Sequence, residues 1–267
     1  MRILVQVAGV ANMSAWNISC SPHQLHVQSA PWSHESRAAK GWTHHRKVQH
    51  TLLHEDIDLV WLVDSDIVPP ASFDCHQYFN VWSSKRPLIS QPTIVNQLSE
   101  FSASLWSRTA AHSHQILKSH WIEQQAPLFN ATYLKWFYET PIVKTVLDLQ
   151  RKNNVAWGLD WIWCKAAAEF DPHATSCACI NVPLVHMNTK TLGWQKNRRS
   201  YIRRGFKLLE QANLRSNLPC REPKCCKLHP WFYMQRFDRV SSSWSWERAF
   251  MRTHNFSDGT LPNAPFC

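Results

Sequence analysis

Short apolar runs recur along the first two-thirds of the chain. Runs rich in β-branched residues, which are typical of buried strands, cover residues 3–10 and 59–63. A third strand is expected over residues 86–95, where the prolines favour an irregular or edge position. "CACINVPLVHMN", residues 177–188, predicts a last strand.

Between these runs, apolar residues recur at helical spacing. The pattern predicts helices over residues 38–54 and 160–170, the second opened by Gly158 and Asp160. The segment "QAPLFNATYLKWFYE" begins as a strand and continues as a helix, whereas residues 12–45 indicate a long loop with short elements. Strands alternating with helices predict an α/β domain whose central, mostly parallel sheet is flanked by helices.

The chain changes character near residue 196. "KNRRSYIRRGFK" holds six basic residues in twelve, and Cys, Pro and Trp follow it. We therefore expect a catalytic or binding domain over residues 1–195 and an irregular, basic, Cys/Trp-rich extension over 196–267, packed on that domain. The 29 Lys and Arg against 19 Asp and Glu give a net charge of +10, which suits an anionic partner. The phosphate-loop motifs GxGxxG and GxxxxGK[ST] do not occur in the sequence.

Cysteines and glycosylation sequons bear on the compartment. Nine cysteines and four sequons, at Asn12, Asn17, Asn130 and Asn255, favour a secretory lumen such as the Golgi. A cytoplasmic location is expected instead if Met1 is the true start and no signal is present. No run approaches the roughly 20 apolar residues of a membrane span. "CREPKCCKLH", residues 220–229, favours disulfides over a zinc site, because its spacing is not a familiar zinc arrangement.

The stretch "VWLVDSDIVPP" carries the most chemical information. Asp64 and Asp66 follow the strand at 59–63, and two neighbouring carboxylates repel each other unless a cation offsets the repulsion. Mg²⁺ and Mn²⁺ are held by one or two carboxylates together with substrate phosphates and water. The pair therefore predicts a metal–diphosphate site at the carboxyl end of a strand, where ligands bind in open α/β sheets.

Two alternatives stay open for this stretch. One is a strand-terminating turn that Pro69 and Pro70 continue. The other is the D-x-D-x-[TV] motif of haloacid-dehalogenase-like phosphatases, in which Asp64 would be the nucleophile. That chemistry needs a later acidic motif, and the near match "GLDWIW" has one carboxylate fewer than the motif requires.

Several motifs together resemble a known family. "DIDLVWLVDSDI", "LISQPTI", "QQAPLFNATYLKWFYE", "NVAWGLDWIWCKAA" and "VPLVHMNTKTLGW" follow one another in the order of a plant and algal family catalogued as domain of unknown function 707. That family looks like nucleotide-sugar glycosyltransferases of the GT-A fold. Residues 56–194 carry the resemblance, while 11–40 and 200–267 match nothing in it. The resemblance implies a GT-A-like catalytic domain within residues 1–195.

The resemblance also implies roles for individual residues. Asp64 and Asp66 would bind a Mn²⁺ or Mg²⁺ ion that bridges the donor diphosphate, and His186 would be a further metal ligand. Asp160 would be the general base that deprotonates the acceptor hydroxyl, with Glu123 as the rival base. Asp160 is also explained as a helix cap, a role compatible with catalysis, and without the resemblance His186 is better explained as an ordinary strand-end residue.

Binding roles follow in the same way. Trp157 and Trp161 would stack on a sugar ring, the alternative being core packing. Lys190, Arg198 and Arg199 would engage the donor phosphates, the alternative being a solvated helix face. The implied reaction moves a sugar from a nucleoside-diphosphate sugar to a glycan or other hydroxyl acceptor. The alternative is a non-catalytic basic protein that binds nucleic acid or glycan. Because that alternative leaves the aspartate pair and His186 without a purpose, we expect no nucleic-acid partner.

Overall fold

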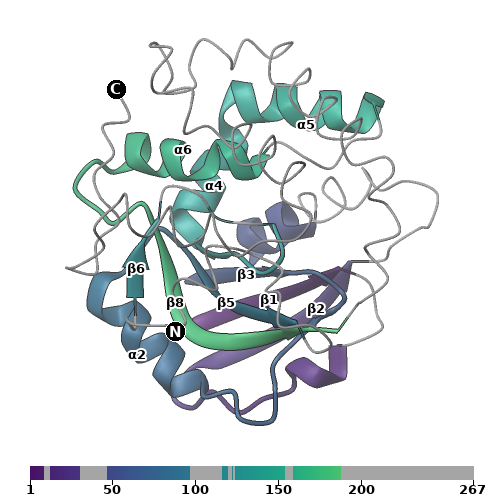
Figure 1. The fold of residues 1–267 in the computed structure, drawn as a ribbon. Coiled ribbons are helices and arrows are strands. Elements are labelled where there is room, and N and C mark those ends of the chain that lie inside the picture. The colour runs from purple at the N-terminus through teal and green to yellow at the C-terminus, as the bar shows by residue number, and fades with distance from the viewer. Residues whose placement is uncertain are drawn as a thin grey trace, which may run out of the picture.

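A mixed sheet of eight strands forms the centre of the computed structural model (Figure 1). The structure describes residues 1–8, 13–30, 47–96, 116–119, 122, 124–153 and 159–187. The strands are β1 Arg2–Ala8, β2 Gln24–Ala30, β3 Leu59–Val63, β4 Ile67–Val68, β5 Ile89–Asn96, β6 Ile116–Lys118, β7 Leu128–Asn130 and β8 Cys177–His186. Their order across the sheet is β2-β1-β3-β7-β5-β8-β4, and β6 pairs with β8 off this path.

The longer strands of the sheet run in one direction. β1 is parallel to both β2 and β3, and β5 is parallel to β8. The short strand β7 is antiparallel to both β3 and β5, so β3 and β5 also point the same way. The carboxyl ends of β1, β2, β3, β5 and β8 therefore lie at one edge of the sheet. This arrangement confirms the predicted α/β class with a mostly parallel sheet.

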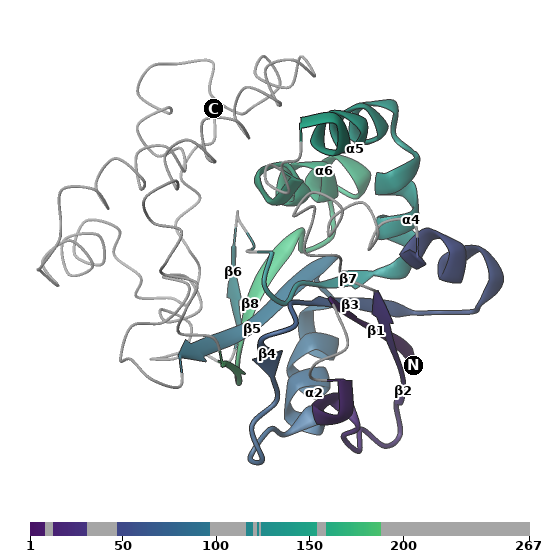
Figure 2. The ribbon, with the colours of Figure 1, turned by 90° about the vertical axis from the view of Figure 1, so that its right-hand side faces the viewer.

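Helices cover both faces of the sheet. The helical elements of the described residues include η1 Met13–Trp16, α2 Cys75–Lys85, α4 Ala131–Glu139, α5 Pro141–Asn153, η2 Leu159–Trp161 and α6 Trp163–Phe170. Helices α4, α5 and α6 lie on one face and α2 on the other (Figures 1 and 2). Alternating side chains of β1 feed the two resulting cores: Leu4 packs on the α4–α6 side and Val5 on the α2 side.

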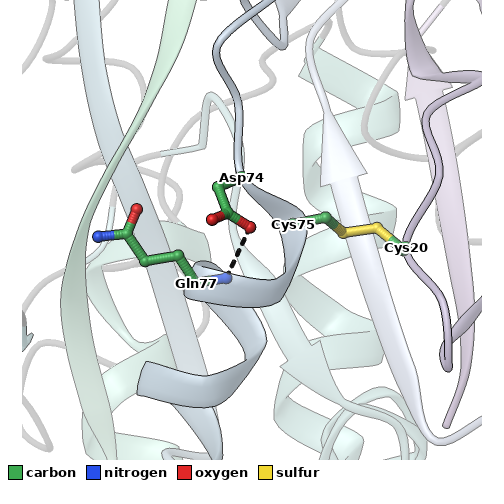
Figure 3. The surroundings of a disulfide bond; sticks show 4 residues. All are labelled: Cys20, Asp74, Cys75 and Gln77. Atoms are coloured by element: carbon green, nitrogen blue, oxygen red, sulfur yellow. Dashed lines mark hydrogen bonds between the residues drawn. A yellow bond between two sulfur atoms is a disulfide. The ribbon is translucent and has the colours of Figure 1, made fainter.

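Local capping explains where two of these helices begin. The carboxylate of Asp74 accepts a hydrogen bond from the backbone N–H of Gln77 at the start of α2 (Figure 3). The side-chain oxygen of Asn130 accepts in the same way from Tyr133 and starts α4 directly after β7. Pro141 at the first position of α5 separates that helix from α4, because proline suits a helix start and breaks a helix interior.

Three predictions of secondary structure need correction. The region predicted as a long loop with short elements contains β2, a seven-residue strand that pairs with β1 along its whole length. The strand predicted at 86–95 lies between β7 and β8, so an edge position was wrong. The expected irregularity is present, since the register with β8 shifts between Pro92 and Thr93. The helix predicted over 160–170 begins as α6 only at Trp163, after the separate turn η2.

Two disulfides lie among the described residues. Cys20 bonds to Cys75 at the start of α2 (Figure 3), and Cys164 of α6 bonds to Cys177 at the start of β8. The Cα atoms of the two pairs are 5.3 and 5.6 Å apart, within the range that a disulfide requires. Cys179 is a buried thiol. The cysteines of 220–229 and the whole extension predicted over 196–267 lie outside the described residues.

Candidate functional site

The two aspartates of "DSD" occupy a tight turn between β3 and β4. The backbone N–H of Ile67 donates to the carbonyl of Asp64 over 3.0 Å, which closes the turn. The backbone N–H of Asp64 donates to the carbonyl of Gln125 over 2.8 Å, so the segment before β7 holds the turn in place. All three turn residues are half-buried. The turn lies at the carboxyl edge of the parallel strands.

Strand pairing brings the second aspartate to the end of β8. β4 pairs with β8 in antiparallel fashion, with Ile67 opposite His186, and the N–H of Met187 donates to the carbonyl of Asp66 over 2.7 Å. The carboxylate Oδ2 of Asp66 lies 3.3 Å from Nε2 of His186. The His186 residue is 8% exposed and the Asp66 side chain 23%. Two of the three predicted metal ligands are therefore in contact, and both are largely screened from water.

Asp160 reaches the same edge through a different connection. It is 4% exposed in η2, and its Oδ1 accepts a hydrogen bond of 3.0 Å from Nε2 of Gln124. Gln124 is the neighbour of Gln125, whose carbonyl holds the Asp64 backbone. The segment before β7 thus ties Asp160 to the turn that carries the aspartate pair. The N-cap position of α6 is Ile162, which makes no side-chain cap bond.

Gln124 is the functional candidate that sequence reasoning missed. An amide side chain in the segment before β7 carries no chemical signature of its own. The doubled glutamine before "APLF" is visible in the sequence, but its contact with Asp160 depends on the fold.

The spacing of the Asp66–His186 pair fits two ligands of one divalent cation. Two ligands about 2.1 Å from one ion and at right angles to each other lie roughly 3 Å apart, close to the observed 3.3 Å. Carboxylate oxygen is a ligand that suits Mg²⁺ and Mn²⁺, and neutral imidazole nitrogen is a common metal ligand. Within the described ranges, no group of three or more His, Cys, Asp or Glu residues could hold a metal ion. The pair therefore fits a site whose remaining positions are filled by substrate oxygens and water, as is usual for Mg²⁺.

Two buried tryptophans donate hydrogen bonds to the backbone at this edge of the sheet. Nε1 of Trp16 donates to the carbonyl of Ile67 over 3.2 Å, next to Asp66. Nε1 of Trp61 donates to the carbonyl of Ala126 over 3.0 Å, next to Gln125. The two indole rings contact each other edge to face, with centroids 5.0 Å apart. Both backbone segments that carry the site are therefore fixed to the α2-side core.

The other predicted site residues lie outside the described part of the chain. These are Glu123, Trp157, Lys190, Arg198 and Arg199. Their predicted roles remain predictions. No helix among the described residues is long and apolar enough to cross a membrane.

Comparisons with known proteins give structural neighbours only. No protein-family model matches the chain, and no curated protein matches it either. The fold is similar to the crystal structure of a glycosyltransferase involved in the glycosylation of the major capsid of PBCV-1, with 10% identity, a TM-score of 0.43, and coverage of 78% of this chain and 98% of that one. For TarS of S. aureus the identity is 8%, the TM-score 0.39 and the coverage 70% and 60%. For a mycobacterial protein the identity is 12%, the TM-score 0.39, and the coverage 79% of this chain and 74% of that one.

Proposed function

We propose that this protein is a metal-dependent, GT-A-like glycosyltransferase that moves a sugar from a nucleoside-diphosphate sugar to a hydroxyl acceptor. The observation that carries the proposal is the 3.3 Å contact between Asp66 and His186 at the carboxyl edge of the sheet. This edge is where open α/β sheets bind ligands. Asp64 in the same turn supplies a second carboxylate within two residues of the first.

Asp66 and His186 would hold the Mn²⁺ or Mg²⁺ ion, with Asp64 contributing directly or through water. When bound, such an ion neutralises negative charge on the diphosphate leaving group. The chain's own contribution is to keep the two ligands in place by pairing β4 with β8. Because the pair is mostly buried, its interaction with charge is stronger than it would be in water.

Asp160 would take the proton of the acceptor. As the acceptor oxygen bonds to the anomeric carbon, the bond from that carbon to the diphosphate oxygen breaks, and the hydroxyl proton passes to the Asp160 carboxylate. Gln124 orients this carboxylate by donating to Oδ1. The link from Gln124 through Gln125 to the Asp64 backbone sets the base relative to the aspartate pair.

Ligand-dependent thermal unfolding tests the proposal. The melting temperature of the wild type should rise when Mn²⁺ and UDP or GDP are added together, because binding to the native state stabilises it. Asp66→Asn and His186→Gln should abolish this rise. Asp148→Asn, which changes an exposed carboxylate on α5, is the matched control and should keep it. An undiminished rise in Asp66→Asn would reject the metal role.

A panel of nucleotide sugars in the same assay then identifies the donor. The phosphatase alternative makes a different prediction, since Asp64 would form a beryllofluoride adduct that mimics an aspartyl phosphate. The nucleic-acid alternative predicts salt-dependent oligonucleotide binding that Asp64→Asn leaves unchanged. Either result, without Mn²⁺-dependent nucleotide binding, would replace the glycosyltransferase proposal.

A further inference from the structure

Two of the four sequons lie in described parts of the fold, and their surroundings differ. Asn17 begins "NIS" directly after η1, and Asn130 begins "NAT" at the junction of β7 and α4. An N-linked glycan is bulky and needs an asparagine at the surface. The fold therefore distinguishes between two motifs that are equivalent in the sequence.

Asn17 is exposed but held in a fixed segment. Its side chain and that of Ser19, the third residue of the sequon, both face solvent. On one side, the buried Trp16 donates to the carbonyl of Ile67, and on the other, the buried Cys20 bonds to Cys75 (Figure 3). The backbone N–H of Asn17 donates to the carbonyl of Ser14 over 3.2 Å. A glycan on Asn17 would extend into solvent without disturbing either anchor.

Asn130 takes part in the sheet and caps the helix that follows it. Its backbone N–H donates to the carbonyl of Leu88 over 2.8 Å, and it pairs with Leu59 across the sheet. Its Oδ1 accepts from the N–H of Tyr133 and caps α4. The flanking residues Phe129 and Ala131 are buried. A glycan on this half-buried side chain would be attached to the same amide group that caps α4, next to buried neighbours.

The disulfides are an independent indication of the compartment. Disulfides form and persist in oxidising compartments such as the lumen of the endoplasmic reticulum, where asparagine-linked glycans are also added. Cys20 lies only three residues after Asn17, so the same surface segment carries both features. We propose that Asn17 is a site of N-linked glycosylation in the folded protein and that Asn130 is not.

The modification requires a lipid-diphosphate-linked oligosaccharide as the donor. The amide nitrogen of Asn17 bonds to the anomeric carbon of the oligosaccharide, and the bond from that carbon to the diphosphate oxygen breaks. The lipid diphosphate leaves, and the amide nitrogen loses one proton to a base of the transferring enzyme. This step is independent of the glycosyltransferase activity proposed for the chain itself.

The test uses the full chain, expressed in cultured eukaryotic cells behind a cleavable secretion signal and purified as the folded monomer. Enzymatic release of N-glycans in ¹⁸O-labelled water converts each glycosylated asparagine to a labelled aspartate, which peptide mass spectrometry locates. We expect the label at Asn17 in most molecules and none at Asn130. The same peptide map under non-reducing conditions reports the Cys20–Cys75 bond.

Matched variants separate the sequon from an effect on folding. Asn17→Gln and Ser19→Ala should each remove one glycan from the electrophoretic pattern. Ser19→Thr should keep it, because threonine also completes the sequon. Asn130→Gln should leave the pattern unchanged. Folded monomers that carry no glycan at Asn17, or that carry one at Asn130, would overturn the inference.

Discussion

Nε2 of His186, the last residue of β8, lies 3.3 Å from Oδ2 of Asp66 in the turn before β4, and only the fold brings these two segments together. The pairing of Ile67 with His186 sets this distance, so the contact depends on the register of β4 and β8. Residues that act as one ligand pair have strongly non-additive effects.

We therefore expect Asp66→Asn and His186→Gln each to remove the Mn²⁺-dependent thermal shift with UDP or GDP, and the double variant to be no worse than either single one. Isothermal titration of Mn²⁺ in the presence of the nucleotide measures this. Losses that simply add would show that the two residues act at separate places.

Replacement of Asp160 should separate binding from chemistry. Asp160→Asn keeps the size and one acceptor oxygen but cannot take a proton. Transfer should fall about a hundredfold or more, in line with the contribution of a general base, while Mn²⁺-dependent donor binding stays unchanged. Unchanged turnover would exclude Asp160 as the base.

Gln124→Ala should have a milder effect of the same kind, since it removes only the bond that orients Asp160. The expected change is a lower kcat with an unaltered KM for the donor. Equal loss of donor binding would indicate that Gln124 supports the turn rather than the carboxylate.

The indole of Trp16 should stabilise the turn that carries the aspartates. Trp16→Phe removes the hydrogen bond to the carbonyl of Ile67 and should lower the free energy of unfolding by about 1 kcal/mol or more, with a further term for the lost volume. Urea denaturation measures the change. Trp136→Phe, on the half-buried face of α4, is a control that leaves the turn intact.

The two disulfides should contribute unequal amounts of stability. From the loop lengths of 55 and 13 residues, chain entropy predicts roughly 4 kcal/mol for Cys20–Cys75 and roughly 3 kcal/mol for Cys164–Cys177. Paired Cys→Ala variants, compared by guanidinium denaturation, test this order. A protein whose midpoint is insensitive to a reducing agent would contradict both contributions.

Buried phenols should make the protein sensitive to alkali. Burial raises the pKa of Tyr78, Tyr133 and Tyr138 well above the ordinary value of 10. A raised folded-state pKa means that the unfolded chain loses these protons first, so stability is level below pH 10 and declines above it. Phenolate absorbance should therefore rise together with loss of circular dichroism. Ionisation of all tyrosines before unfolding would contradict the burial.

Sequence patterns predicted the parts of the fold whose signals are local. β3 was predicted with the bounds found, because its apolar residues are buried on both faces of an interior strand. The prediction missed β2, although Leu25 and Val27 alternate with His26 and Gln28 as in a half-buried strand. It also missed α2, whose Asp74 cap was readable in principle.

The sequence also predicted only part of the candidate site. Asp64 and Asp66 were identified from residue type and position, Asp160 and His186 from the family resemblance, and the fold brings Asp66 into contact with His186. Gln124 could not be predicted from the sequence, because its proposed role depends on a contact between η2 and the segment before β7. Tertiary contacts of neutral side chains leave no periodic or chemical mark in a single sequence.

The irregularity at Pro92 has a consequence for the imidazole. Between the pairs Pro92–Ile180 and Thr93–Pro183, β8 advances three residues while β5 advances one, so β8 accommodates two surplus residues. An even surplus preserves side-chain parity, and His186 stays on the face of Ile180 and Leu184. An odd surplus would turn the ring to the opposite face, away from Asp66. The number of extra residues in β8 must therefore stay even. Deleting one of them would separate His186 from Asp66 although neither residue is changed.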